Sequence, residues 1–208
     1  MTFQTWIAFS VAAGIVLIIP GPTIITVISH SLAHGRRAVI ALVLGVTLGD
    51  LTAMTCSLLG LGAILALSAT LFAALKLLGA FYLIYLGVKL WRTEPKMEAS
   101  SLAAKAYSSR SLLTNLFVVT ALNPKSIVFF IAFLPQFVTP SGQALPQLLV
   151  LGGTFLFLGA VNATLYALFA GHLRERMQNT KAHRWFNRCG GTALIGAGFV
   201  TATMRQSS

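Results

Sequence analysis

Asp50 is the residue with the clearest chemical potential in this sequence, because it is the only acidic side chain inside a long apolar segment. A carboxylate near the centre of a bilayer costs roughly 2.5–3.5 kcal/mol, so such residues usually face a cavity or a partner. Asp50 could carry a proton or balance the ammonium group of a substrate. The structural alternatives are an ion pair with Lys125 and a hydrogen bond to interrupted backbone. We favour the functional interpretation, which is the default for an ionisable residue in a membrane.

Proline interrupts two apolar segments, at Pro20-Gly21-Pro22-Thr23 and at Asn123-Pro124-Lys125-Ser126. Proline removes a backbone donor and clashes with the preceding turn. In hydrocarbon, the freed groups are tolerated only where protein or a wet cavity satisfies them. The half-helix after each break begins with unpaired amides of positive character, which can receive a carboxylate near Thr23 and Ser126. Upstream carbonyls and Asp50 can receive an ammonium group or a proton, so the breaks predict a site for a zwitterion such as an amino acid. The alternative is that both breaks are packing kinks.

Two further polar side chains in apolar segments are candidates for the site. Lys125 could contact a substrate carboxylate or neutralise Asp50, or it could snorkel or bond to the carbonyls that Pro124 frees. Asn162 holds roughly the place in the second half of the chain that Asp50 holds in the first, where it could hydrogen-bond across a pseudo-twofold axis or join helices. The predicted substrate site therefore comprises Pro20, Gly21, Pro22, Thr23, Asp50, Asn123, Pro124, Lys125, Ser126 and Asn162.

The sequence contains no pattern that indicates catalysis or a bound cofactor. It has no GxxxxGK[ST] motif, so nothing indicates direct coupling to ATP. His30 and His34 have a spacing that suits a metal, but no further ligands gather nearby, and we interpret them as interface residues. Cys56 and Cys189 form no CxxC pair, and their apolar surroundings predict core packing without a disulfide. We therefore expect no enzyme, no cofactor and no metal site.

The elements that must position these residues are membrane helices. The 208 residues are 56% hydrophobic and 9% charged, whereas soluble domains carry about 25% charged residues. A spanning helix needs about 20 mostly apolar residues. The sequence predicts six such helices in an all-α integral membrane protein, from Phe3 to Ile28, Ala38 to Leu67, Thr70 to Trp91, Leu112 to Phe137, Leu145 to Gly171 and Arg188 to Met204.

Basic residues, which give the chain a net charge of +11, mark one side of the predicted membrane domain. They gather in the first, third and fifth connections, whereas the second and fourth connections carry no charge. By the positive-inside rule the odd connections are cytoplasmic, and both termini face outward. The charge is therefore interpreted as an orientation signal, and we expect no nucleic-acid partner.

The long polar connection Arg92 to Ser111 divides a single domain, residues 1–208, near its middle. Half one covers residues 1–91, the cytoplasmic linker 92–111 and half two 112–208. Three helices in each half force the second half to be inverted relative to the first, a 3+3 arrangement found in many secondary transporters. The first helix of each half carries a proline break, and paired interruptions of this kind indicate a binding site near the membrane midplane.

Several motifs occur in order along nearly the whole chain: Pro20-Gly21-Pro22, Gly45-x-x-x-Gly49-Asp50, Lys76-x-x-Gly79-Ala80-x-Tyr82-Leu83-x-Tyr85-x-Gly87 and Asn123-Pro124-Lys125. Together they resemble the lysine/threonine exporter family (LysE/RhtB type). The resemblance implies a multi-pass protein of the bacterial inner membrane that exports amino acids or their derivatives by secondary active transport, with protons as the expected coupling ion. It implies a small-molecule substrate, a coupling ion and the lipid bilayer as partners, and leaves a homodimer open. The alternatives are a divalent-metal or other ion exporter of similar architecture and a membrane assembly partner that transports nothing.

Overall fold

The computed structural model describes residues 1–67, 69–92, 108–138 and 143–171, with single residues between Arg188 and Phe199. Every element in these residues is helical, which confirms the predicted all-α class. Most of the predicted linker 92–111 and of the predicted sixth span, Arg188 to Met204, lies outside the described residues.

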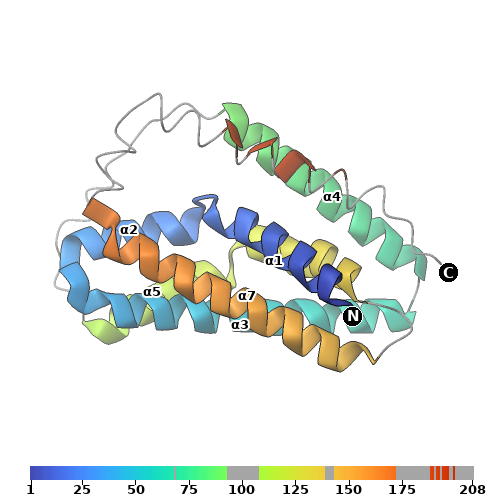
Figure 1. Ribbon diagram of the computed structural model, residues 1–208, viewed down its shortest axis with the longest axis horizontal. Helices are drawn as coiled ribbons and strands as arrows, with labels where there is room; N and C mark the ends of the chain where they lie inside the picture. Colours follow the sequence, from blue (N-terminus) through green and yellow to red (C-terminus); the bar gives the residue numbers. More distant parts are fainter. Residues whose placement is uncertain are drawn as a thin grey trace.

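Both predicted proline breaks are helix boundaries in the structure. Helix α1 ends at Ile18 and α2 begins at Pro22, while α5 ends at Ala121 and α6 begins at Pro124. Proline suits the first position of a helix because its missing N–H has no intrahelical partner there. The elements are α1 (Phe3–Ile18), α2 (Pro22–His34), the 3-10 turn η1 (Gly35–Ala38), α3 (Val39–Leu67), α4 (Ala69–Arg92), α5 (Ser109–Ala121), α6 (Pro124–Val128), the π-helical turn η2 (Phe129–Phe133), the 3-10 turn η3 (Leu134–Phe137) and α7 (Ala144–Leu168). The longer helices are labelled in Figure 1.

Two stretches of the described residues, Pro22–Gly60 and Ala144–Leu168, are long and apolar enough to cross a membrane. A third candidate is the pair Ser109–Ala121 and Pro124–Phe137, which bends by 44° at the second break. The structure thus supports a helical membrane protein with two or three candidate spans. It supports fewer than the six predicted from sequence for three reasons: α1, with 16 residues, is shorter than a full span; α4 contributes only the shorter apolar stretch Ala80–Lys89; and the last segment is described only in part. The inverted 3+3 arrangement stays a prediction.

Helix α3, which carries Asp50, reverses the direction of α2 (Figure 1). Gly35 makes the reversal with a φ of 67°, a conformation that favours glycine. Further along α3, Gly45 and Gly49 face α5: a Cβ atom on Gly49 would lie 2.6 Å from the Cβ of Thr120. The two glycines therefore allow the close helix approach expected of a GxxxG pattern. This approach brings the helix of Asp50 against the helix that leads into the second break.

Phenylalanine side chains fill the core on the other side of the second break. Phe129 and Phe130 on η2 are 1% and 0% exposed, and both contact Phe155 of α7 with ring centroids 5.0 and 4.8 Å apart. Phe9 of α1 contacts Phe129 at 6.1 Å. These rings join α1, η2 and α7 into one hydrophobic cluster. This cluster packs the helix before the first break against the turn that follows the second break.

The prediction that both cysteines pack in the core is wrong. Cys56 on α3 and Cys189 in the last segment are both free and exposed. Apolar neighbours in the sequence do not separate a lipid-facing position from a core position, because both favour apolar side chains in a membrane protein. Near Cys189, Gly191 lies against Gly87 of α4, where a Cβ atom on either glycine would meet the carbonyl of the other.

Candidate functional site

The first break leaves the carboxyl end of α1 without its normal backbone donors. In a continued helix the carbonyls of Val16 and Ile18 would accept from the amides of residues 20 and 22, but both of these are proline. The chain also leaves the helical conformation at Ile19, which has a ψ of 114°. The last carbonyls of α1 must therefore find donors elsewhere, because an unpaired carbonyl inside a membrane protein is costly.

Side chains from the second half of the chain supply these donors. The ammonium group of Lys125 donates to the carbonyls of Val16 and Ile19, at 3.1 and 2.8 Å. Asn162 Nδ2 of α7 donates to the carbonyl of Leu17 at 3.0 Å. One turn further along α7, the Tyr166 hydroxyl donates to the carbonyl of Ile18 at 2.7 Å. The consecutive carbonyls from Val16 to Ile19 are all hydrogen-bonded in this way, and we call this group the α1 carbonyl end.

These contacts bear on two of the structural alternatives drawn from sequence: they correct the one for Lys125 and agree with helix joining by Asn162. Lys125 bonds to carbonyls at the first break, whereas the sequence suggested the carbonyls that Pro124 frees. Asn162 joins helices α7 and α1 through the carbonyl of Leu17. Sequence reasoning missed Tyr166 altogether. Its signal was present, since a residue four positions after Asn162 lies on the same face of a helix.

The two breaks are joined directly by side chains. Asn123 caps α6, because its Oδ1 accepts from the amide of Lys125 at 3.1 Å. The Nδ2 group of the same residue donates to Thr23 Oγ1 on α2 at 3.1 Å, and the hydroxyl of Thr120 donates to the same oxygen at 3.4 Å. Since Thr23 Oγ1 accepts both bonds, its own proton is available to a ligand. Thr23 is 7% exposed and Asn123 is 3% exposed, so this contact is buried.

The amino ends of the two half-helices differ in what they offer a ligand. Gly21 precedes α2 and has no side chain to cap it, so the amides of Thr23 and Ile24 lack a side-chain partner. The first amide of α6, that of Lys125, is already bonded to Asn123. Pro124 occupies the first turn of this helix and Ser126 is buried in it. The half-helix whose first amides have no side-chain cap is therefore α2, and the predicted symmetry between Thr23 and Ser126 is only partial.

Asp50 lies on α3 beside α7 and α6. It is 4% exposed, and a Cβ atom on Gly159 of α7 would lie 3.5 Å from its Oδ2. The Ser126 side chain lies within hydrogen-bonding reach of its carboxyl group, and Lys125 is close enough to act on it electrostatically. The other carboxyl oxygen, Oδ1, is buried and has no hydrogen-bond partner. An unsatisfied carboxyl oxygen of this kind is costly in a protein interior and suits a transient partner such as a proton or an ammonium group.

The predicted site residues thus gather around the junction of the breaks. Pro20, Gly21 and Pro22 form the first break, and a Cβ atom on Gly21 would lie 3.4 Å from Lys125 Nζ. The arrangement offers a positive end at α2, a negative end at α1 and a buried carboxyl group, the signs that a zwitterion requires. The histidines lie apart from the junction: His30 Nε2 lies 3.2 Å from Asn115 Oδ1, and His34 Nδ1 donates to the carbonyl of His30. The described part of the chain holds no group of three or more His, Cys, Asp or Glu side chains that could bind a metal ion.

Comparison with known proteins supplies the family context of this site. Residues 14–205 match the family described as LysE type translocator. An uncharacterised membrane protein of Vibrio cholerae is 30% identical over 205 residues, 99% of this chain and 100% of the relative. A homoserine/homoserine lactone efflux protein of Salmonella typhimurium is 31% identical over the full length of both chains. A leucine efflux protein of an Enterobacter species is 28% identical over 100% of this chain and 96% of its own. No solved structure matches the chain.

Proposed function

The chain belongs to the LysE type translocator family of membrane transporters, and from this premise we propose that it exports amino acids or amino-acid derivatives by secondary active transport, with protons as the coupling ion. The observation that carries the proposal is the junction of the two breaks, where the uncapped α2 amides, the α1 carbonyl end and Asp50 lie together. These groups match the charges of a zwitterion. Relatives named as homoserine/homoserine lactone and leucine efflux proteins favour the same class of substrate.

We further propose that six spans form two inverted halves, with residues 92–111 and the other basic connections in the cytoplasm of a bacterium and both termini outside. The charge distribution along the sequence supports this orientation. The hydrogen bonds that join Thr23 of the first half to Asn123 of the second support a site between the halves. Rocking of one half against the other around such a site is the motion used by many transporters built from repeats.

In the proposed cycle the substrate carboxylate docks on the α2 amides near Thr23, whose hydroxyl proton is available to it. Its ammonium group binds on the side of the α1 carbonyl end and Asp50. Asp50 takes up a proton from outside and releases it to the cytoplasm as the halves rock, so that one proton gradient drives substrate outward. The Ser126 side chain lies next to the Asp50 carboxyl group, so its hydroxyl can reorient when that group gains or loses its proton.

Substrate class is tested by a toxicity panel in cells that overproduce the chain. Homoserine, leucine, other amino acids, toxic analogues and metal salts are added in excess, and growth is compared with that of cells carrying an empty vector. We expect protection against amino acids or analogues, accompanied by their appearance in the medium. Protection against metal salts alone would instead support an ion exporter, and protection against nothing would contradict export.

A further inference from the structure

The α1 carbonyl end is occupied by a cationic side chain of the protein itself, that of Lys125. Lys125 Nζ donates to the carbonyls of Val16 and Ile19 from the other half of the chain. The carboxyl end of a helix carries partial negative charge and favours a cation. A lysine head is a compact ammonium group on a flexible stem, so it is the same chemical group as the α-ammonium of an amino acid.

The Lys125 ammonium group lies beside the start of α2, whose uncapped amides could bind a carboxylate. Only Ile19 to Gly21 separate the negative end of α1 from the positive end of α2. Gly21 lies against the lysine head, since a Cβ atom on it would be 3.4 Å from Nζ and 3.6 Å from Cε. An amino acid whose carboxylate bound the α2 amides would therefore bring its own ammonium group to the position of Lys125 Nζ.

Asp50 provides a second position for the lysine. Its Oδ1 is buried without a hydrogen-bond partner, although the carboxyl group and Lys125 interact electrostatically. Leaving a buried carboxyl oxygen unpaired is unfavourable, and a nearby ammonium group relieves this cost. A lysine that left the carbonyls of α1 would thus find a partner without leaving the junction.

We propose that the carbonyls of Val16 and Ile19 form the subsite for the α-ammonium group of the transported amino acid, that Lys125 fills this subsite while no substrate is bound, and that substrate displaces Lys125 toward Asp50. The proposal rests on the proposed function and deepens it. Displacement links each bound substrate to the charge of the Asp50 carboxyl group. It also restricts the substrate class to molecules with a free ammonium group, because only these can take the place of the lysine.

The test compares amino acids with analogues that lack the ammonium group. Binding of leucine and homoserine, and of 4-methylpentanoate and 4-hydroxybutanoate, is measured on the purified full chain in lipid nanodiscs. In Lys125→Met the subsite is vacant, so leucine or homoserine binds on the order of tenfold more tightly, since no competing group has to leave. The analogues do not compete with the lysine, so their affinity does not change in this variant. The ratio of the affinity for an amino acid to the affinity for its analogue does not depend on the fraction of folded protein. Lys89→Met on α4 is the control.

The outcomes separate the failure of this subsite from the failure of the proposed function. Weaker binding of both classes in Lys125→Met would mean that Lys125 holds the carboxylate, and an unchanged ratio would mean that it only caps α1; either result overturns the proposal. If the wild-type chain binds and exports no amino acid, the proposed function itself fails. Should Lys125→Met not fold, Asp50→Asn provides the test, because the displaced lysine then lacks its carboxylate partner. In this variant leucine is expected to bind on the order of tenfold more weakly relative to 4-methylpentanoate. The proposal is overturned if the ratio of leucine affinity to 4-methylpentanoate affinity in Asp50→Asn equals or exceeds the wild-type ratio.

Discussion

At the scale of single residues, the hydroxyl of Thr23 joins the two breaks and faces the proposed substrate carboxylate. Its oxygen accepts from Asn123 and Thr120, which directs its proton away from both. Sequence placed Thr23 after a proline break and so identified it as a candidate. The sequence could not show its partners, because they lie 97 and 100 residues further along the chain.

Thr23→Val keeps the shape of this side chain and removes its hydroxyl. We expect kcat/KM for efflux to fall about tenfold or more, the factor that corresponds to a hydrogen bond to a charged group. Thr26→Val is the matched control on the same helix, since the Thr26 hydroxyl donates only to the carbonyl of Pro22. Efflux is measured with radiolabelled leucine and homoserine in cells that contain equal amounts of each variant. Equal losses in the two variants would argue against a substrate contact by Thr23.

Lys125 and Tyr166 show where residue-level prediction from the sequence ends. The loss of donors at Val16 and Ile18 follows from the positions of Pro20 and Pro22 alone. Which side chains replace those donors depends on how α6 and α7 pack against α1, and that is a property of the tertiary structure. A tyrosine in an apolar segment has ordinary roles at a membrane interface, so the signal of Tyr166 was limited to its position four residues after Asn162.

At the scale of elements, the contact between α3 and α5 positions Asp50 relative to the second break. Gly45 and Gly49 permit this contact, and their spacing made the packing role predictable. The helix ends at the breaks were predictable for a similar reason, because proline acts locally. Which face of a helix turns toward lipid and which toward the core was harder to predict from the sequence, as the exposed Cys56 shows.

Gly49→Ala tests the positioning role of this helix contact. A Cβ atom there would lie 2.6 Å from the Cβ of Thr120 and 2.9 Å from the carbonyl oxygen of Phe117, so the helices must separate. Overpacking of this kind costs typically 1–3 kcal/mol, and we expect a lower unfolding temperature in detergent together with reduced efflux. Gly60→Ala on the same helix is the control, because nothing lies within 4 Å of its added Cβ. Equal stability of the two variants would contradict the packing account.

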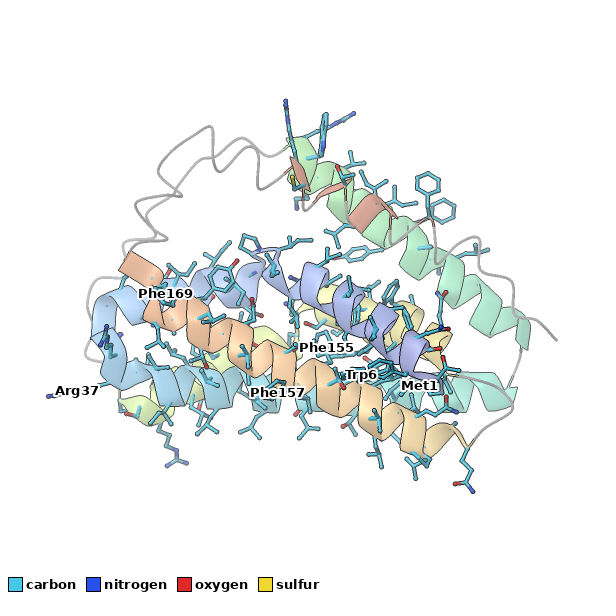
Figure 2. The ribbon with its side chains drawn as sticks, in the orientation of Figure 1. Met1, Trp6, Arg37, Phe155, Phe157 and Phe169 are labelled. Carbon is cyan, nitrogen blue, oxygen red and sulfur yellow. The ribbon has the colours of Figure 1, made fainter. Side chains whose placement is uncertain are left out.

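At the scale of the whole molecule, the charge distribution predicts which end of the bundle faces the cytoplasm. Met1 and Arg37 lie at opposite ends of the molecule in Figure 2, and both are exposed. The all-α class and the membrane location followed from composition. Six spans in two inverted halves remain a prediction, because a helix count alone does not relate one half to the other.

Single cysteines test this orientation. In a chain whose own Cys56 and Cys189 are replaced by serine, Gln4→Cys is expected to react with a membrane-impermeant maleimide added to intact spheroplasts. Arg37→Cys is expected to react only after permeabilisation, because the positive-inside rule places it in the cytoplasm. The reverse pattern of labelling would contradict the proposed topology.

We propose that Asp50 couples the proton gradient to amino-acid export at the junction of the breaks. The most direct measurement is accumulation of radiolabelled leucine or homoserine by inverted inner-membrane vesicles with an acidic interior, with a protonophore as the control. We expect Asp50→Asn to reduce accumulation to the level of protonophore-treated wild type, because asparagine cannot release a proton, while the protein is still inserted in equal amount. Proton-driven accumulation by Asp50→Asn at the wild-type level would contradict the account.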